Sequence, residues 1–299
     1  MSRRLAASEM YPAGETRVRS QYVELANGLR VRTVQSGRDD APPVVLIPGW
    51  GCSAWIFHET LAPLADSGFR AIAVDLKGHG LSDKPRDPSE YTVDAMRDHL
   101  LAILDALRLE QVGLVGHSMG GAIAAHAAAV SPDRITGLVM VAPVGFAGVR
   151  GMTLFRALTP RFAIAILPWL ARRTLIRIML QVVYGSLRRP TERDIDEFWA
   201  PTRFPDFTRA LRHLLHEFDW KSDFPRLRIP RLTIVGSKDV LSPPSDLARY
   251  ADEATRAGTL IVEGSGHVMF DEAPETVNHA LAAFFGGGSR ARYISLQNE

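Results

Sequence analysis

Three polar side chains of this sequence, Ser118, Asp239 and His267, have the types and the chain order that nucleophilic catalysis by a serine requires. Ser118 stands in the stretch 116–120, Gly-His-Ser-Met-Gly, which fits the pattern Gly-x-Ser-x-Gly. A serine hydroxyl becomes a strong nucleophile only when a base removes its proton, and that base needs an acid to orient it. We therefore assign His267 as the base and Asp239 as the acid. Three other acids lie within a helix or beyond the histidine and fit this role less well: Asp246, Asp271 and Glu272.

The segments around these residues predict how they meet. The apolar run 111–118 is typical of a buried strand, and the small-residue stretch that follows it is typical of a helix. A serine on such a sharp turn presents its hydroxyl at the carboxyl end of the strand. Asp239 and His267 lie just past two later strand-like runs, 231–237 and 258–264. The three side chains are therefore expected to meet at one edge of a sheet.

An ester or amide reaction also needs donors for the developing oxyanion. The backbone N–H of Met119 is one candidate, because it lies at the positive end of the helix that follows the serine. The loop 48–53, Pro-Gly-Trp-Gly-Cys-Ser, supplies the second candidate, the backbone N–H of Trp50.

The rest of the chain predicts an α/β fold. Asn27-Gly28 between two β-prone runs indicates a hairpin. Later runs that are apolar throughout alternate with amphipathic stretches, which favours parallel strands with helices on both faces. The further strands are expected at 43–49, 70–76 and 134–143, and the helices at 54–67, 93–107, 119–130, 245–254 and 274–285. Residues 1–18 look like a loose lead-in, and the last 14 residues like a mobile tail.

The alternation of strands and helices stops between residues 142 and 231. We interpret 146–205 as a helical cap on a core formed by 1–145 and 206–299, with the next core helix at about 206–217. Residues 151–190 contain seven arginines and no acid, whereas 191–197 contains four acids. Two interpretations remain open: a solvated basic face partly paired with the acidic stretch, or a docking face for a lipid surface or an acidic carrier.

With these motifs, the sequence resembles the α/β-hydrolase family, in particular its serine esterase and lipase-like members with a helical cap. The resemblance spans roughly residues 20–286 and includes DLKGHGLSDKP (75–85), GSKDVLSP (236–243) and GSGHVMFDEAPE (264–275). It implies an α/β-hydrolase fold and structural roles for Asp75, Gly78, His79, Gly80 and Ser82. One departure is Pro48-Gly49, where family members often have His-Gly. Dehalogenases and epoxide hydrolases of this fold have an aspartate where this chain has Ser118, so the resemblance disfavours those two activities.

Composition limits the other function classes. The 35 basic and 33 acidic residues give a net charge of +2, which offers no bulk-charge argument for a nucleic-acid partner. The single cysteine, Cys52, excludes an intramolecular disulfide and a thiolate-rich metal site, and we assign it to packing. We expect no cofactor and no metal, because six histidines lie on helical stretches without an acid-rich cluster: His58, His99, His126, His213, His216 and His279. With no secretory-signal pattern and no 18-residue apolar run, we expect a cytoplasmic protein, its oligomeric state left open.

The sequence therefore predicts a carboxylic-ester hydrolase that works through an acyl-enzyme, without a cofactor, on medium-sized apolar acyl or aromatic esters. Several alternatives keep the same three residues: a meta-cleavage-type carbon–carbon bond hydrolase, a lactonase, an amide-cleaving peptidase, or an esterase for carrier-bound acyl methyl esters, whose loop the stretch PGWG resembles. A ligand receptor that keeps the fold and signals through its cap is an alternative from another class.

Overall fold

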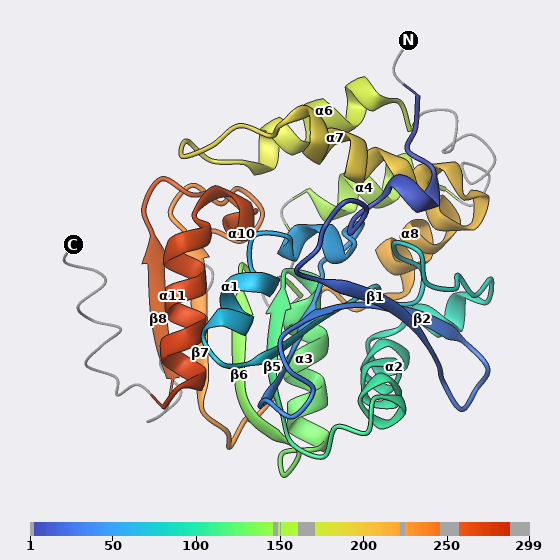
Figure 1. The fold of residues 1–299 in the computed structure, drawn as a ribbon. Helices are drawn as coiled ribbons and strands as arrows, with labels where there is room; N and C mark the ends of the chain where they lie inside the picture. The colour runs from blue at the N-terminus through green and yellow to red at the C-terminus, as the bar shows by residue number, and fades with distance from the viewer. Residues whose placement is uncertain are drawn as a thin grey trace.

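The computed structural model of the chain describes residues 3–145, 149, 151–160, 171–221, 225–245 and 257–287. One eight-stranded sheet with the strand order β1-β2-β4-β3-β5-β6-β7-β8 forms its centre (Figure 1). The strands are β1 (Arg19–Glu24), β2 (Arg30–Ser36), β3 (Pro43–Ile47), β4 (Arg70–Val74), β5 (Val112–His117), β6 (Ile135–Val141), β7 (Arg231–Gly236) and β8 (Ala257–Val262).

The pairing of the strands confirms the predicted α/β sheet with an antiparallel hairpin at its start. β1 pairs with β2 and β2 with β4 in the antiparallel direction, whereas the strands from β4 through β3 to β8 are parallel. Gly28 has a φ of +80° in the turn between β1 and β2, a conformation that glycine adopts without steric cost. Because consecutive parallel strands end at the same edge, this topology collects the loops after β3, β5, β7 and β8.

Helices cover both faces of the sheet, and the side chains of β4 show why. Ile72 and Val74 point into a core cluster with α2 and α3, whereas Ala71 and Ala73 point into a second cluster with α1 and α11. A strand between two helical layers must be apolar on both sides, as these runs are. The helices of the two layers and the short helical turns beside them are η2 (Ala54–Phe57), α1 (Leu61–Asp66), η3 (Pro88–Tyr91), α2 (Val93–Ala106), α3 (Met119–Val130), α10 (Met269–Glu272) and α11 (Pro274–Phe285).

One predicted helix is divided in the structure, and another lies mostly outside the described residues. The single helix predicted at 54–67 is divided into η2 and α1. Pro63 lacks the N–H that a continuous helix would bond to residue 59, so proline fits only in the first turn of α1. Most of the helix predicted at 245–254, from residue 246 on, and the tail from residue 288 on lie outside the described residues. Among the residues that the structure describes, no helix combines the length and the apolar character needed to cross a membrane.

Between β6 and β7 the described residues form only helices and loops. These helices are α4 (Met152–Leu158), α6 (Arg173–Val183), α7 (Glu192–Trp199), η5 (Ala200–Arg203) and α8 (Pro205–Glu217). Figure 1 shows α6 and α7 side by side across one end of the sheet. Parts of the interval, 146–148, 150 and 161–170, lie outside the described residues. We keep the division into a core and a cap at 146–205 as a proposal.

The arginines of α6 pair with the acidic stretch, as one of the two interpretations of the sequence expected. Arg173 binds Asp196 at 2.6 Å and Glu192 at 2.8 Å, and Arg177 binds Glu192 at 2.6 Å. Both arginines therefore turn toward α7. A basic solvated face is not found on α6, because the exposed residues of this helix are not basic: Thr174, Leu175, Ile178, Met179, Gln181 and Val182.

The start of the chain is not the loose lead-in that the sequence predicted. Met10 and Tyr11 are 2% and 3% exposed. The backbone N–H of Tyr11 donates to Glu197 of α7 at 2.8 Å, and the guanidinium of Arg32 donates to the Tyr11 carbonyl at 2.7 Å. These contacts join the N-terminal segment to both β2 and α7.

The buried carboxylate of Glu197 predicts a pH-dependent stability. Burial raises its pKa to about 7, against the lowering effects of Arg193 and of the Tyr11 N–H. Between pH 4.5 and 7 the folded state therefore keeps a proton that the unfolded state has lost, so this group makes the protein less stable as pH rises through that window. The effect of Glu197→Gln on the free energy of unfolding should become more favourable by about 2–3 kcal/mol from pH 5 to 8. Urea denaturation at both pH values measures it, and equal effects at the two values contradict the prediction.

Candidate active site

Ser118 lies at the sharp turn between β5 and α3. Its φ of +53° is unusual for a residue with a side chain, and the glycines around it permit the turn. A Cβ on Gly116 would lie 2.5 Å from the Cα of Gly121, and one on Gly120 would lie 2.7 Å from the carbonyl oxygen of Pro48. Both glycines are therefore required by close backbone approach. The turn holds the serine at the carboxyl end of β5, where the sequence predicted it.

The structure brings the three predicted residues together. The Nε2 atom of His267 lies 2.9 Å from the Oγ atom of Ser118, and its Nδ1 atom lies 2.8 Å from Oδ2 of Asp239. All three residues are buried: Ser118 is 7% exposed, His267 5% and Asp239 3%. A chain of two hydrogen bonds thus links a hydroxyl, an imidazole and a carboxylate, shielded from most of the solvent.

The environment of Asp239 keeps it ionised. Its Oδ1 accepts from the backbone N–H groups of Leu241 and Ser242 at 2.8 and 3.0 Å, and its Oδ2 accepts from the Ser242 hydroxyl at 2.9 Å. Burial alone would raise the pKa of Asp239, but the charge and hydrogen bond of His267 and these N–H groups hold that pKa well below its usual range. A carboxylate at this place accepts the Nδ1–H of His267. The lone pair of Nε2 is then directed at the serine hydroxyl.

The backbone around His267 is held by a residue whose role the sequence did not reveal. The two carboxylate oxygens of Glu272 accept from the N–H groups of Gly266 and Gly185 at 2.9 and 2.7 Å. The N–H of His267 itself donates to the carbonyl of Val183, the last residue of α6, at 2.7 Å. Sequence reasoning treated Glu272 only as a weaker rival for the catalytic acid. Glu272 links Gly185 to Gly266, and this link depends on where residues 183–185 lie, which no local sequence pattern predicts.

The loop after β3 runs directly against Ser118. A Cβ on Gly49 would lie 2.8 Å from the Cβ of the serine, so no larger residue fits there. The next residue, Trp50, is anchored by its indole N–H, which donates to the Leu211 carbonyl at 2.9 Å. Met119 is the first residue of α3, so its N–H belongs to the first turn, where donors have no acceptor within the helix. The two predicted oxyanion donors therefore belong to backbone segments that adjoin the serine.

Two residues beside the site, His117 and Cys52, each keep one protonation state near neutral pH. Burial lowers the pKa of His117 to about 3, so its ring is neutral and bonds the His267 carbonyl through Nε2 at 2.9 Å. Burial raises the pKa of Cys52 to about 12. The thiol therefore stays protonated near neutral pH, which does not suit a second nucleophile.

Asp75 has the structural role that the resemblance implies. It is fully buried, pairs with Arg32 at 2.7 Å, and accepts from the N–H groups of Ala54 and Leu81 at 2.7 and 2.8 Å. These bonds fix the loop after β4 to β2 and to the first residue of η2. His79 of the same loop is buried, and that burial lowers its pKa to about 4, so it is not charged near neutral pH.

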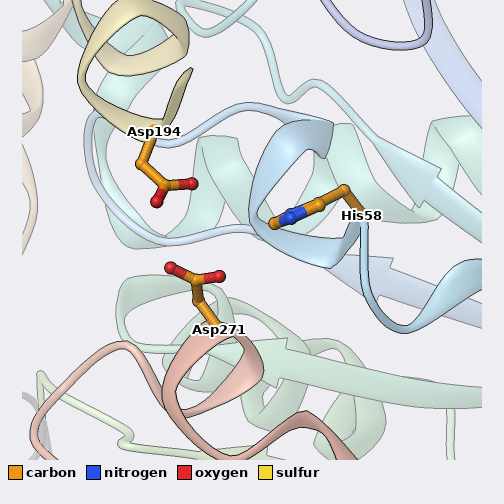
Figure 2. A group of neighbouring side chains, drawn as sticks. All are labelled: His58, Asp194 and Asp271. Atoms are coloured by element: carbon orange, nitrogen blue, oxygen red, sulfur yellow. The ribbon is translucent and has the colours of Figure 1, made fainter. Parts of the chain in front are cut away.

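A second group of titratable side chains contradicts the expectation that His58 has no acids gathered around it. Figure 2 shows His58 facing Asp194 of α7 and Asp271 of α10. One potential ligand atom of each residue lies within 4.8 Å of those of the other two. The carboxylates are already engaged: Arg188 binds Asp271 at 2.6 Å, and Tyr184 donates to it as well. Asp194 accepts from the Thr191 hydroxyl and backbone N–H, both at 2.7 Å, and from the Trp55 indole at 3.2 Å.

A cation bound among these three side chains would compete with the guanidinium of Arg188 for Asp271. The observed contacts instead tie α7 to Trp55 of η2, and α10 to Tyr184 and Arg188 in the segment between α6 and α7. The sequence could not show this group, because its members are separated by more than 70 residues and come from three different elements.

Comparisons with known proteins agree with this architecture. A sequence model of the alpha/beta hydrolase fold matches residues 42–274. The dihydrolipoyllysine-residue acetyltransferase component of the acetoin cleaving system of Pseudomonas putida is 29% identical over 266 residues, which are 86% of this chain and 67% of that protein. Epoxide hydrolase A of Mycobacterium tuberculosis is 25% identical over an alignment that covers 87% of this chain and 95% of that protein.

Among solved structures, the carboxylesterase CesB of Bacillus subtilis superposes with a TM-score of 0.78. Its sequence is 20% identical, and the match covers 95% of each chain. At this identity the similarity concerns the fold alone.

Proposed function

The chain belongs to the alpha/beta hydrolase family, and from this premise we propose that it cleaves carboxylic esters through an acyl-enzyme intermediate on Ser118. The observation that carries the proposal is the 2.9 Å contact between the Ser118 hydroxyl and Nε2 of His267, whose other nitrogen is bonded to Asp239. A nucleophile, a base and an orienting acid in this arrangement perform acyl transfer in unrelated proteins.

In the proposed first half-reaction, His267 Nε2 takes the proton of the Ser118 hydroxyl while Oγ bonds to the ester carbonyl carbon. The electron pair of the C=O bond moves to its oxygen, which the N–H groups of Met119 and Trp50 stabilise. When the pair returns, the C–O bond to the alcohol breaks, and the proton on His267 passes to the departing alkoxide. In the second half, water attacks the acyl-enzyme with the same proton transfers and releases the acid and Ser118.

The identity of the nucleophile favours ester cleavage over epoxide opening. One relative is an epoxide hydrolase. The resemblance to the family implies an aspartate at this turn in its epoxide hydrolases, whereas this chain has Ser118. A serine adds to an acyl carbon and gives an ester intermediate that water can hydrolyse. Medium-sized apolar acyl or aromatic esters remain our proposed substrates, because the loop that adjoins the serine at Gly49 continues into Trp50, and the next residue, Gly51, faces Leu211.

Labelling with a fluorophosphonate tests the proposal. The serine oxygen should displace fluoride from phosphorus, with His267 taking the proton, to give one phosphonyl group per chain on the peptide that contains Ser118. Loss of p-nitrophenyl ester turnover should follow the labelled fraction in proportion. Cys52→Ser should label and turn over like the wild type. The proposal is contradicted if mass spectrometry finds the label on another residue, or if a fully labelled sample keeps full activity.

A substrate panel separates the alternatives that share the triad. Esters graded by acyl length should be the best substrates, compared with an epoxide, a lactone, an anilide and a vinylogous diketone. A linear progress curve over many turnovers distinguishes an enzyme from a ligand receptor. Preference for the diketone or the lactone by about 100-fold or more in kcat/KM would replace the ester assignment.

A further inference from the structure

The outer side of α6 is an apolar surface. Leu175, Ile178, Met179 and Val182 follow the spacing i, i+3, i+4, i+7, which places them on one face of the helix. They are 43%, 52%, 38% and 58% exposed, and we call these four residues the α6 face. Large aliphatic side chains gathered on one exposed helix face mark a binding surface more often than a solvated one.

Other residues of the same helix attach it to the protein, so the α6 face is not needed for that attachment. Leu180 is buried, and Ile176 and Val183 pack against the same core cluster. Arg173 and Arg177 bind the carboxylates of α7, as described above. The helix is therefore fixed in place by its other residues, and the exposed apolar residues are left for a partner.

The dimensions and the flanking charges indicate what kind of partner fits. A stable protein–protein interface takes about 20–30 residues a side, whereas the α6 face consists of four residues. A helix lying in a membrane interface needs only one apolar face, bordered by cationic side chains that meet anionic headgroups. Arg172, directly before α6, and Arg189, in the loop after it, are exposed and offer cationic side chains on both sides of this helix in the sequence. With 11 residues, α6 is too short to cross a bilayer but long enough to lie on one.

We propose that the α6 face docks the protein on an anionic phospholipid surface, with the four apolar side chains inserted among the headgroups and Arg172 and Arg189 near the phosphates. The proposal does not depend on the proposed catalytic function, because none of these residues contacts Ser118, Asp239 or His267. It leaves the chain peripheral to the membrane.

Vesicle flotation of the full chain tests the proposal with two compositions, phosphatidylcholine alone and an equal mixture with phosphatidylglycerol. The wild type should float with the mixed vesicles and bind the neutral ones more weakly. Ile178→Glu/Met179→Glu should lower the partition coefficient on mixed vesicles by about 10-fold or more, because two carboxylates replace apolar groups. Arg172→Gln and Arg189→Gln should each lower it by about fivefold on mixed vesicles only.

The control is Val130→Glu, which makes the same kind of change at a residue that is 54% exposed at the far end of α3. It should bind vesicles like the wild type. All variants should keep wild-type turnover of a water-soluble p-nitrophenyl ester, so a failure of the catalytic proposal would appear separately. If the double variant does not fold, Leu175→Gln and Val182→Gln make the same test more gently.

Three results would overturn the proposal: a wild type that floats with neither composition, a double variant that binds like the wild type, or equal binding to neutral and mixed vesicles. A dimer of the wild type that the double variant abolishes, seen by light scattering, would assign the α6 face to a second copy of this chain instead.

Discussion

Replacing Ser118 with alanine is expected to lower kcat/KM for p-nitrophenyl esters by about 10⁴–10⁶-fold. The variant lacks the oxygen that lies 2.9 Å from His267 Nε2, and a methyl group can form no acyl-enzyme. The fold should survive, because the bonds that shape this turn are backbone ones: the N–H of residue 118 to Val141 and its carbonyl to Gly121, both at 2.9 Å. Steady-state kinetics measures the loss, and circular dichroism checks that the variant is folded.

The matched control for this prediction is Cys52→Ser, which changes a buried side chain on the neighbouring loop without touching the proposed proton path. It should retain turnover within about threefold, because the serine hydroxyl is similar in size and can donate to the Trp50 carbonyl as the Cys52 thiol does. If Ser118→Ala instead keeps more than about a tenth of the wild-type rate, the nucleophile is misassigned.

Asp239→Asn should lower kcat by about 10⁴-fold with little change in KM. The two N–H groups that bond Oδ1 will hold the amide oxygen of asparagine at that position, which turns the NH₂ group toward Nδ1 of His267. An NH₂ donor cannot accept the Nδ1–H, so the ring is forced into the tautomer with its proton on Nε2. That nitrogen then cannot take the proton of Ser118. Initial rates over pH 6–9 measure the loss.

Asp271→Asn is the control, since Asp271 is another buried aspartate close to the same loop but is bonded to Tyr184 and Arg188 instead of the histidine. Its kcat should fall by less than about 10-fold. Equal losses in the two variants would show that the effect of Asp239→Asn comes from general disturbance of this region and not from the tautomer of His267.

Local pattern was enough to predict the sheet and the meeting of Ser118, Asp239 and His267. Each of the three directly follows an apolar run, and parallel strands bring their carboxyl ends to one edge. The glycine at 116 added a signal, because a Cβ there would meet Gly120 and Gly121 of the same strand-to-helix turn. The glycine at 120 is needed for a different reason, since a Cβ there would meet the backbone of Ile47 and Pro48 at the end of the neighbouring strand. These features are short-range in sequence or follow from a general rule of topology.

What the sequence could not predict depends on contacts between distant segments. The burial of Tyr11 requires Glu197 of α7, and the group of His58, Asp194 and Asp271 requires three elements to meet. The orientation of α6 was ambiguous for a different reason: apolar residues occur on both its buried and its exposed side, so periodicity alone does not tell which side faces the protein. Only the position of α7, which takes Arg173 and Arg177, decides it.

The hydrogen bond from the His267 N–H to the Val183 carbonyl couples the end of α6 to the position of the histidine. The end of α6 and the loop of the histidine touch backbone to backbone, and a Cβ on Gly185 or on Gly266 would lie 2.5 Å from the other's nitrogen. A lid that opened by lifting the C-terminal end of α6 would drag the imidazole out of line with the serine. The C-terminal end of α6 and the alignment of the base are therefore mechanically coupled, and a shift of one displaces the other.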